Sequence, residues 1–259
     1  MIRALLWDVD GTLAETERYG HLVAFNQAFA ALRVPWRWSE SRYGELLAVA
    51  GGRERLLHDM QTQPLAPARA AERERLAAAL HRCKNQHYEG IVASGRLPLR
   101  PGVMQLLDEC RAARVQMAIA TTTTRGNVEA LLRAQLGPAW RGRFVTLVCA
   151  EDAPLKKPDP SVYEIALEGL GIKAHEALAI EDAPAGIEAA RRAGVPVIVT
   201  RSYYFPDAAT SAALAAGPHL GCVEGWRPAA RAGGEARVTL AQLQHWHAGL
   251  RLNQAVGDR

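Results

Sequence analysis

Two aspartates, Asp8 and Asp10, stand two positions apart after a short apolar run at residues 2–7. Such a run predicts a buried strand that ends at these aspartates, so both side chains can point to the same side. Two neighbouring carboxylates repel each other unless a cation offsets them. A divalent cation such as Mg²⁺ would keep one ionised, and the other could take up a proton and act as an acid. The alternative is a plain turn, because Asp-Val-Asp-Gly is also good turn chemistry.

Hydroxyl and ammonium groups suited to phosphate occur further along the chain. Thr121 and Thr122 follow an apolar strand predicted at 115–120, where hydroxyls and backbone amides can bind phosphate oxygens. Lys156 and Lys157 lie in a Lys-Lys-Pro turn before a helix predicted at 161–170, and a lysine there could bring its charge to a carboxylate and a phosphate. Taken alone, the threonines could equally be a strand end or helix cap, and the lysine a solvent-exposed turn.

A second acidic pair, Glu181 and Asp182, follows an apolar strand predicted at 177–180. By itself this pair would be an ordinary N-cap for the next helix. However, the carboxyl ends of parallel strands meet at one edge of a sheet, where open α/β sheets bind their ligands. The order of the four motifs along the chain therefore predicts one site that combines carboxylates, hydroxyls and a lysine.

The elements that position these residues alternate between strand and helix. Helical spacing at 104–114 and 184–193 alternates with apolar strands, including 144–149 and 196–200, which is typical of right-handed crossovers on a parallel sheet. Residues 16–99 show helical spacing without a convincing strand. We therefore expect an α/β fold, a Rossmann-like parallel-sheet core from 1–15 and 100–259 with an inserted α-helical cap at 16–99. Residues 206–236 are expected to be irregular, with weak helical spacing at 239–250 in this tail.

Composition excludes several classes of protein. With 49% hydrophobic residues in 259, the chain is expected to fold, and no apolar stretch approaches the roughly 20 residues of a membrane helix. The net charge of +4 is dispersed, which argues against nucleic acid and suits a small anionic substrate. The scattered cysteines are expected to be reduced thiols in a cytoplasmic protein. A monomer is expected, because a cap must open and close over the site.

With its four motifs in this order, the sequence resembles the haloacid dehalogenase-like phosphatase superfamily, in the form with a helical cap after the first strand. The resemblance runs from residue 1 to about Tyr204. It implies that Asp8 is the nucleophile that forms an aspartyl-phosphate, and that Asp10 protonates the leaving alcohol and then activates water. It also implies that Thr121 and Lys157 steady the phosphoryl group.

The same resemblance implies a bound Mg²⁺. Its ligands would be Asp8, the backbone carbonyl of Asp10, and Asp182. For Glu181, direct ligation and a supporting role behind the ligands are both open.

The choice of substrate must come from the cap, because a phosphoryl site does not specify the alcohol. Glycines there let a backbone approach a ligand, and arginines can bind a second phosphate. The candidates for substrate binding are Glu17, His21, Tyr43, Gly51, Gly52, Arg53, Arg55 and Lys84, together with Thr122 of the core. Each also has a simpler explanation, such as a solvated helix start for the arginines and a solvent-facing side chain for Lys84.

Several cap and core segments resemble the CbbY type within this superfamily, whose characterised activity is that of a xylulose-1,5-bisphosphate phosphatase. They are residues 14–17, 24–26, 51–55, 121–131 and 156–158. The sequence departs from that pattern by one extra residue around His21 and by Arg53 in place of lysine. The resemblance implies a small phosphorylated sugar as substrate. A mutase resembling β-phosphoglucomutase and a non-catalytic phosphosugar sensor remain as alternatives.

Overall fold

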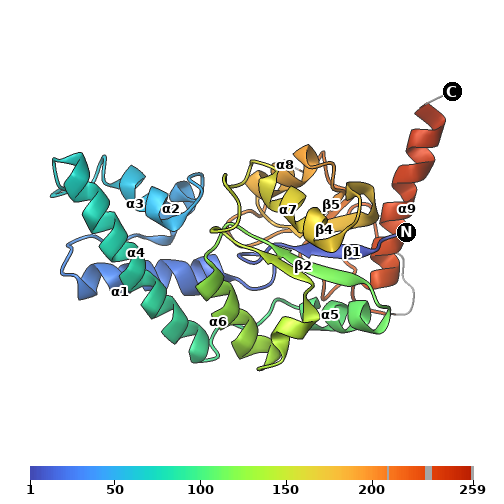
Figure 1. Ribbon diagram of the computed structural model, residues 1–259, viewed down its shortest axis with the longest axis horizontal. Coiled ribbons are helices and arrows are strands. Elements are labelled where there is room, and N and C mark those ends of the chain that lie inside the picture. Colours follow the sequence, from blue (N-terminus) through green and yellow to red (C-terminus); the bar gives the residue numbers. More distant parts are fainter. Residues whose placement is uncertain (209, 231–234, 258–259) are drawn as a thin grey trace.

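The structure, a computed structural model, describes residues 1–208, 210–230 and 235–257 (Figure 1). A six-stranded parallel sheet has the order β3-β2-β1-β4-β5-β6. The strands are β1 (Ala4–Trp7), β2 (Gln116–Ala120), β3 (Thr146–Val148), β4 (Ala177–Glu181), β5 (Val197–Thr200) and β6 (Ala215–Gly217). The first strand is central, because β1 pairs with both β2 and β4 in register at Leu6.

Side-chain size differs between the two faces of the sheet. Larger side chains such as Trp7 and Ile119 face one buried cluster, whereas small ones such as Ala4 and Ala179 face the other, as the alternation along a strand requires. The first cluster includes residues of α5 (Val103–Ala112), α6 (Arg125–Leu136) and α9 (Leu240–Gly257). The second includes residues of α7 (Ser161–Leu170) and α8 (Pro184–Arg192). Alanines on the second face let these helices approach the sheet closely.

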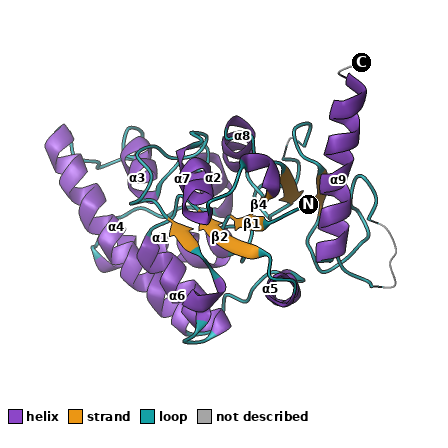
Figure 2. Ribbon diagram, turned by 45° about the vertical axis from the view of Figure 1, so that its right-hand side comes forward, coloured by secondary structure: helices purple, strands orange, loops and turns teal. Residues whose placement is uncertain are grey.

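Residues 17–93 are largely helical and lie at one end of the molecule (Figure 1). This segment, which we call the helical insertion, contains η1 (Glu17–His21), α1 (Leu22–Ala31), α2 (Glu40–Leu46), α3 (Gly52–Asp59) and α4 (Ala70–Ala93). Its own buried cluster is rich in aromatic side chains, among them Phe25, Phe29 and Trp38. The long helix α4 packs against α1 and also against α6 of the core (Figure 2). The insertion is therefore supported by its own core and by one core helix.

Both connections of the insertion run side by side. Ala14, after β1, forms an isolated bridge with Leu99, and the backbone N–H of Arg100 donates to the carbonyl of Leu13 at 2.8 Å. The two ends of the insertion thus leave the core at one place, next to the loop that carries Asp8 and Asp10.

The expected parallel α/β fold is confirmed, and most elements differ from expectation by one or two residues. One part of the expectation is wrong: residues 206–236 include β6. The Ala-Ala-Gly sequence of β6 has little strand propensity, but β5 offers it an edge on which Ile198 pairs with Ala215. Trp226 packs against Gly217, where a Cβ would lie 2.3 Å from the indole. None of the helices in the described part of the chain combines the length and apolar character needed to cross a bilayer.

Candidate active site

A cavity of about 270 Å³ lies between the carboxyl edge of the sheet and the helical insertion. Its lining includes almost all of the residues that the sequence singled out. They are Asp8, Asp10, Glu17, His21, Gly51, Gly52, Arg53, Arg55, Lys84, Thr121, Thr122, Lys157, Glu181 and Asp182. Tyr43 is buried behind the lining and contacts two of these residues. The fold thus brings together side chains that lie far apart in the sequence.

Lys157 is the central cation of the core side. Its Nζ donates to Oδ1 of Asp8 and Oε1 of Glu181, both at 2.7 Å, and to the carbonyl of Ala120 at 2.8 Å. Burial raises the pKa of Asp8 to about 7, because it outweighs the opposing effect of Lys157, and Glu181 adds to the rise. For Lys157 itself, burial disfavours the charge, but the two carboxylates prevail and raise its pKa. The ammonium therefore stays charged beside Asp8.

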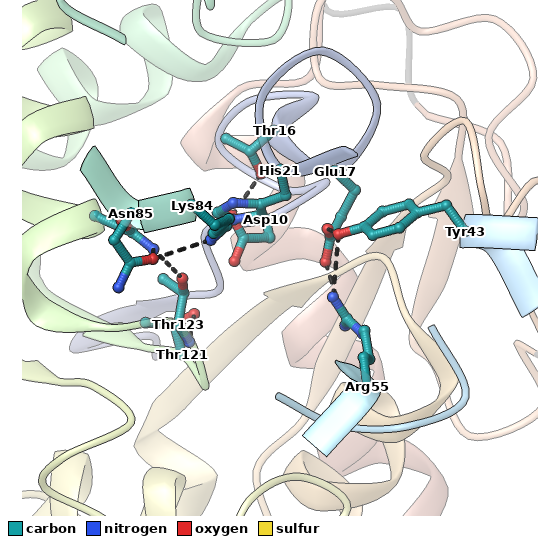
Figure 3. Close-up of polar contacts among 11 residues, drawn as sticks. Asp10, Thr16, Glu17, His21, Tyr43, Arg55, Lys84, Asn85, Thr121 and Thr123 are labelled. Atoms are coloured by element: carbon teal, nitrogen blue, oxygen red, sulfur yellow. Dashed lines mark hydrogen bonds and ion pairs between the residues drawn. The ribbon is translucent and has the colours of Figure 1, made fainter. Parts of the chain in front are cut away.

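Asp10 lies in a different electrostatic setting. Thr16 donates to its Oδ1 at 2.5 Å, and Nε2 of His21 lies 3.0 Å from the same oxygen (Figure 3). Burial opposes ionisation here as well, but His21 and Thr16 outweigh it and lower the pKa of Asp10 below its usual range. Two carboxylates of one site thus have pKa values displaced in opposite directions, an arrangement typical of an acid or base paired with a nucleophile.

Asp8, Glu181 and Asp182 form a buried acidic cluster in which one oxygen from each lies within 4.8 Å of the others. Among the described residues, Oδ1 of Asp182 has no hydrogen-bond partner. Burial and the charges of Asp8 and Glu181 raise the pKa of Asp182. Hard carboxylate oxygens with excess negative charge fit a divalent cation such as Mg²⁺ or Ca²⁺.

Glu181 is less available than Asp182 to bind a cation. Its Oε1 accepts hydrogen bonds from Lys157 and the Tyr163 hydroxyl, and its Oε2 accepts from the backbone N–H of Asp182 at 3.3 Å. Because both oxygens already have protein donors, the geometry favours a role for Glu181 in positioning Lys157 and Asp182. Asp182 and Asp8 are the better candidates to contact a cation.

The threonine loop follows β2 and leads into α6. Thr121 is buried, its backbone N–H donates to the carbonyl of Val148 at 3.0 Å, and its Oγ1 accepts from the N–H of Thr123 at 3.3 Å. Thr122 lines the cavity beside it. Thr121 and Thr122 therefore line the same cavity as the acidic cluster, where a threonine hydroxyl could bind a phosphate oxygen.

On the insertion side, Glu17, Tyr43 and Arg55 form one hydrogen-bonded group (Figure 3). The Tyr43 hydroxyl donates to Glu17 and accepts from Nη1 of Arg55 at 3.1 Å. Nη2 of Arg55 lies 3.5 Å from Oε1 of Glu17, and its Nε donates to the carbonyl of Val49 at 2.9 Å. Arg55 is thus held with its guanidinium at the cavity wall.

The side chains of Lys84 and Arg53 both line the cavity but differ in burial. Lys84 is buried, so the simpler explanation of a solvent-facing side chain does not hold for it. Its Nζ donates to Oδ1 of Asn85 at 3.2 Å. Burial lowers the pKa of Lys84 to about 8, although the charges of Asp10 and Glu17 oppose the change. Arg53 also lines the cavity, but its side chain is 50% exposed and pairs with Glu74 at 2.5 Å.

Comparison with known proteins agrees with this geometry. The haloacid dehalogenase-like hydrolase family matches residues 2–194. This chain belongs to the haloacid dehalogenase-like hydrolases. The superfamily resemblance inferred from the four motifs is therefore confirmed. In this hydrolase, the candidate site is lined by residues of both the core and the helical insertion.

Among hydrolases of this family, the chain is similar to CbbY proteins. It is 44% identical to the plasmid-encoded protein CbbY of Cupriavidus necator over 249 residues, which cover 96% of this chain and 98% of the relative. Its structure is similar to the crystal structure of CbbY from Rhodobacter sphaeroides in complex with phosphate, with a TM-score of 0.82 and 36% sequence identity. The comparison covers 94% of this chain and 100% of that one. A variant of the same protein, solved in complex with xylulose 1,5-bisphosphate, has the same identity and TM-score. That comparison covers 94% of this chain and 99% of the variant.

Sequence reasoning did not single out several residues of this hydrolase site. Asn127, in the first turn of α6, has its Nδ2 3.3 Å from Oγ1 of Thr123 and 3.5 Å from Oδ1 of Asn85. Thus a chain of polar contacts joins Lys84 of the insertion to the threonine loop. The position of Asn127 shortly after the threonines was a usable signal. For Asn85, nothing in the helical spacing of α4 distinguishes it from its polar neighbours.

Proposed function

We propose that this chain is a magnesium-dependent sugar-phosphate phosphatase that hydrolyses xylulose 1,5-bisphosphate to xylulose 5-phosphate and phosphate. The observation that carries the choice of substrate is the similarity, over 94% of this chain, to a CbbY variant solved in complex with xylulose 1,5-bisphosphate. The cavity has a compatible distribution of charge. Asp8 and Asp182 belong to its acidic core side, and Arg55 and Lys84 to a basic insertion side.

Asp8 and Asp182 would hold the Mg²⁺, with the backbone carbonyl of Asp10 as a further ligand and Glu181 behind them. When bound, the cation would offset the negative charge of the carboxylates and of the phosphoryl oxygens. Lys157 would keep its ammonium at Asp8 and bind a phosphoryl oxygen, and Thr121 would donate its hydroxyl to another.

In the first chemical step, an oxygen of Asp8 forms a bond to phosphorus while the bond from phosphorus to the sugar oxygen breaks. Asp10 gives its proton to that sugar oxygen. In the second step, Asp10 takes a proton from water, whose oxygen attacks the aspartyl-phosphate and releases inorganic phosphate. The lowered pKa of Asp10 keeps this carboxylate ionised, so it is ready to accept the proton of water in the second step. The first step requires Asp10 to hold a proton when the sugar leaves, and Nε2 of His21 lies 3.0 Å from Oδ1 of Asp10.

The decisive assay measures release of inorganic phosphate with Mg²⁺ from xylulose 1,5-bisphosphate, ribulose 1,5-bisphosphate, β-glucose 1-phosphate and sugar monophosphates. We expect a strong preference for xylulose 1,5-bisphosphate. Isomerisation of β-glucose 1-phosphate with little release of phosphate would instead make the chain a mutase. Binding of sugar phosphates without turnover would make it a sensor. Asp8→Asn is the control, because contaminating phosphatases would survive this substitution.

We also expect the chain to act as a cytoplasmic monomer, since the helical insertion has to open for the substrate to enter. Sedimentation of the purified protein with and without substrate tests the oligomeric state. A stable dimer under assay conditions would contradict this expectation.

A further inference from the structure

One charged pair joins the helical insertion to the core at the cavity wall and takes no part in the steps above. Lys156 directly precedes Lys157 in the loop before α7, and Glu54 lies in the first turn of α3. Their side chains form an ion pair, and both line the cavity that contains Asp8. Lys156 is thus a core cation that faces the insertion, although its sequence context is that of a solvent-exposed turn.

The ammonium of Lys156 rests against bare main chain. Gly51 has a φ of +96°, and a Cβ there would lie 2.1 Å from Nζ of Lys156 and 2.2 Å from Oε2 of Glu54. A side chain at Gly51 would therefore displace the pair. An anion that replaced the Glu54 carboxylate would contact Lys156 and lie beside the Gly51–Gly52 turn, where there is no side chain to block its approach.

The surroundings of the pair are positive even with Glu54 in place. His81 lies next to Gly52, where a Cβ would be 3.1 Å from the imidazole. Burial lowers the pKa of His81 to about 4, and the charges of Lys84 and Lys156 add to this effect more than Glu54 opposes it. Two ammonium groups, those of Lys84 and Lys156, thus line this side of the cavity together with the Glu54 carboxylate.

The Lys156–Glu54 pair is easily exchanged. The side chains are 29% and 47% exposed, and ion pairs so accessible to water contribute little to stability. A phosphate group carries more negative charge than a carboxylate and offers three acceptor oxygens. It is therefore a better partner for Lys156 than Glu54 is.

The two cap arginines have their partners within the insertion itself. Arg53 pairs with Glu74, and Arg55 is held by Glu17, Tyr43 and the carbonyl of Val49. In contrast, the partner of Lys156 is a residue of the opposite wall, so exchange of that partner also frees the insertion from the core at this point.

We propose that the Lys156–Glu54 pair is a clasp that the second phosphate of a bisphosphate opens, with Lys156 then binding that phosphate. This inference rests on the proposed function and adds a specificity device to it. Glu54 occupies the position of the second phosphate before the substrate binds. A monophosphate lacks the group that displaces Glu54, so the clasp stays closed and the monophosphate gains nothing from Lys156.

The test compares dissociation constants for xylulose 1,5-bisphosphate and xylulose 1-phosphate, with Mg²⁺, in the Asp8→Asn background. Lys156→Met should weaken binding of the bisphosphate about tenfold or more and that of the monophosphate far less. Glu54→Gln should have the opposite sign and tighten binding of the bisphosphate. Lys173→Met is the matched control, because this exposed lysine precedes η3 (Ala174–Glu176), away from the cavity.

Opposite signs for the two substitutions are the distinguishing result, since loss of a merely structural bridge would weaken binding of both ligands in both variants. Equal effects of Lys156→Met on the two ligands, or weaker bisphosphate binding in Glu54→Gln, would overturn the clasp. Thermal melting of each variant shows whether it is folded. Turnover by the wild-type protein is measured separately. Failure to release phosphate from the bisphosphate would refute the proposed function, while the binding comparison would still decide the clasp.

Discussion

Nε2 of His21 lies 3.0 Å from Oδ1 of Asp10, and the imidazole is held in that position by stacking on Tyr88 with ring centroids 4.3 Å apart. His21 is the residue that contributes most to lowering the pKa of Asp10 against the effect of burial. The stacking thus holds His21 where it can contact Asp10, and this contact favours the ionised form of Asp10.

We predict that His21→Phe raises the pKa of Asp10, because phenylalanine keeps the stacking but cannot hydrogen-bond. The acid limb of the pH profile of kcat, which reports Asp10 as the base of the second step, should then move to higher pH, and kcat should fall about tenfold or more. His21→Gln, which retains a donor, should shift the limb less. An acid limb at the same pH in wild type and His21→Phe would show that His21 does not control Asp10.

Asp182 is expected to lower the stability of the protein when no cation is bound. Its pKa is raised by burial and by Asp8 and Glu181, so folding favours the protonated form and the carboxylate opposes folding. This penalty is absent below the unfolded-state pKa and grows as pH rises toward the folded-state value. Asp182→Asn should therefore unfold at higher temperature than wild type in chelator, by about 2–4 °C for each 1 kcal/mol of stabilisation.

Two controls separate this effect from a general gain in stability. The difference in melting temperature between Asp182→Asn and wild type in chelator should be larger at pH 8 than at pH 4. Addition of Mg²⁺ should stabilise the wild type and have a much smaller effect on the variant. A difference independent of pH would rule out the ionisation of Asp182 as its cause.

Lys157→Met should be strongly destabilising and inactive. Removal of Lys157 leaves Asp8 and Glu181 buried without their common cation, and breaking a buried ion pair costs about 3–5 kcal/mol. Urea unfolding in chelator measures this cost. Lys157→Met in combination with Asp8→Asn should recover part of it, because one of the two unpaired charges is then gone; equal stability of the single and double variants would contradict the electrostatic explanation.

Arg100 connects the loop after β1 to the ends of β5 and β6. Its guanidinium donates to the carbonyls of Gly11, Thr200 and Pro218, and its Nε lies 3.2 Å from Glu15. Arg100→Met would leave these buried carbonyls without a donor, so we expect a loss of about 2–4 kcal/mol in urea unfolding. Arg100→Lys should lose less. Stability within about 0.5 kcal/mol of wild type would mean that water replaces the guanidinium.

The core of the site followed from the sequence because its residues are placed by strand ends. Asp8, Thr121 and Asp182 each come at or directly after an apolar strand, and parallel strands bring their carboxyl ends to one edge. Apolar runs, the polar residues that end them and the alternation of strands with helices can all be recognised in the sequence. These patterns were therefore enough to predict both the fold class and the carboxylate cluster.

The partners of the charged side chains in the helical insertion were decided only by the tertiary structure. Arg53 and Arg55 are two positions apart, yet Arg55 is held at the cavity wall and Arg53 pairs with Glu74 of α4. Likewise Lys156 reaches Glu54 across about a hundred residues of chain. Helical periodicity predicts which face of a helix is apolar, but an ion pair depends on distances between elements. Those distances are set by the packing of α3 and α4 against each other and of the insertion over the sheet edge.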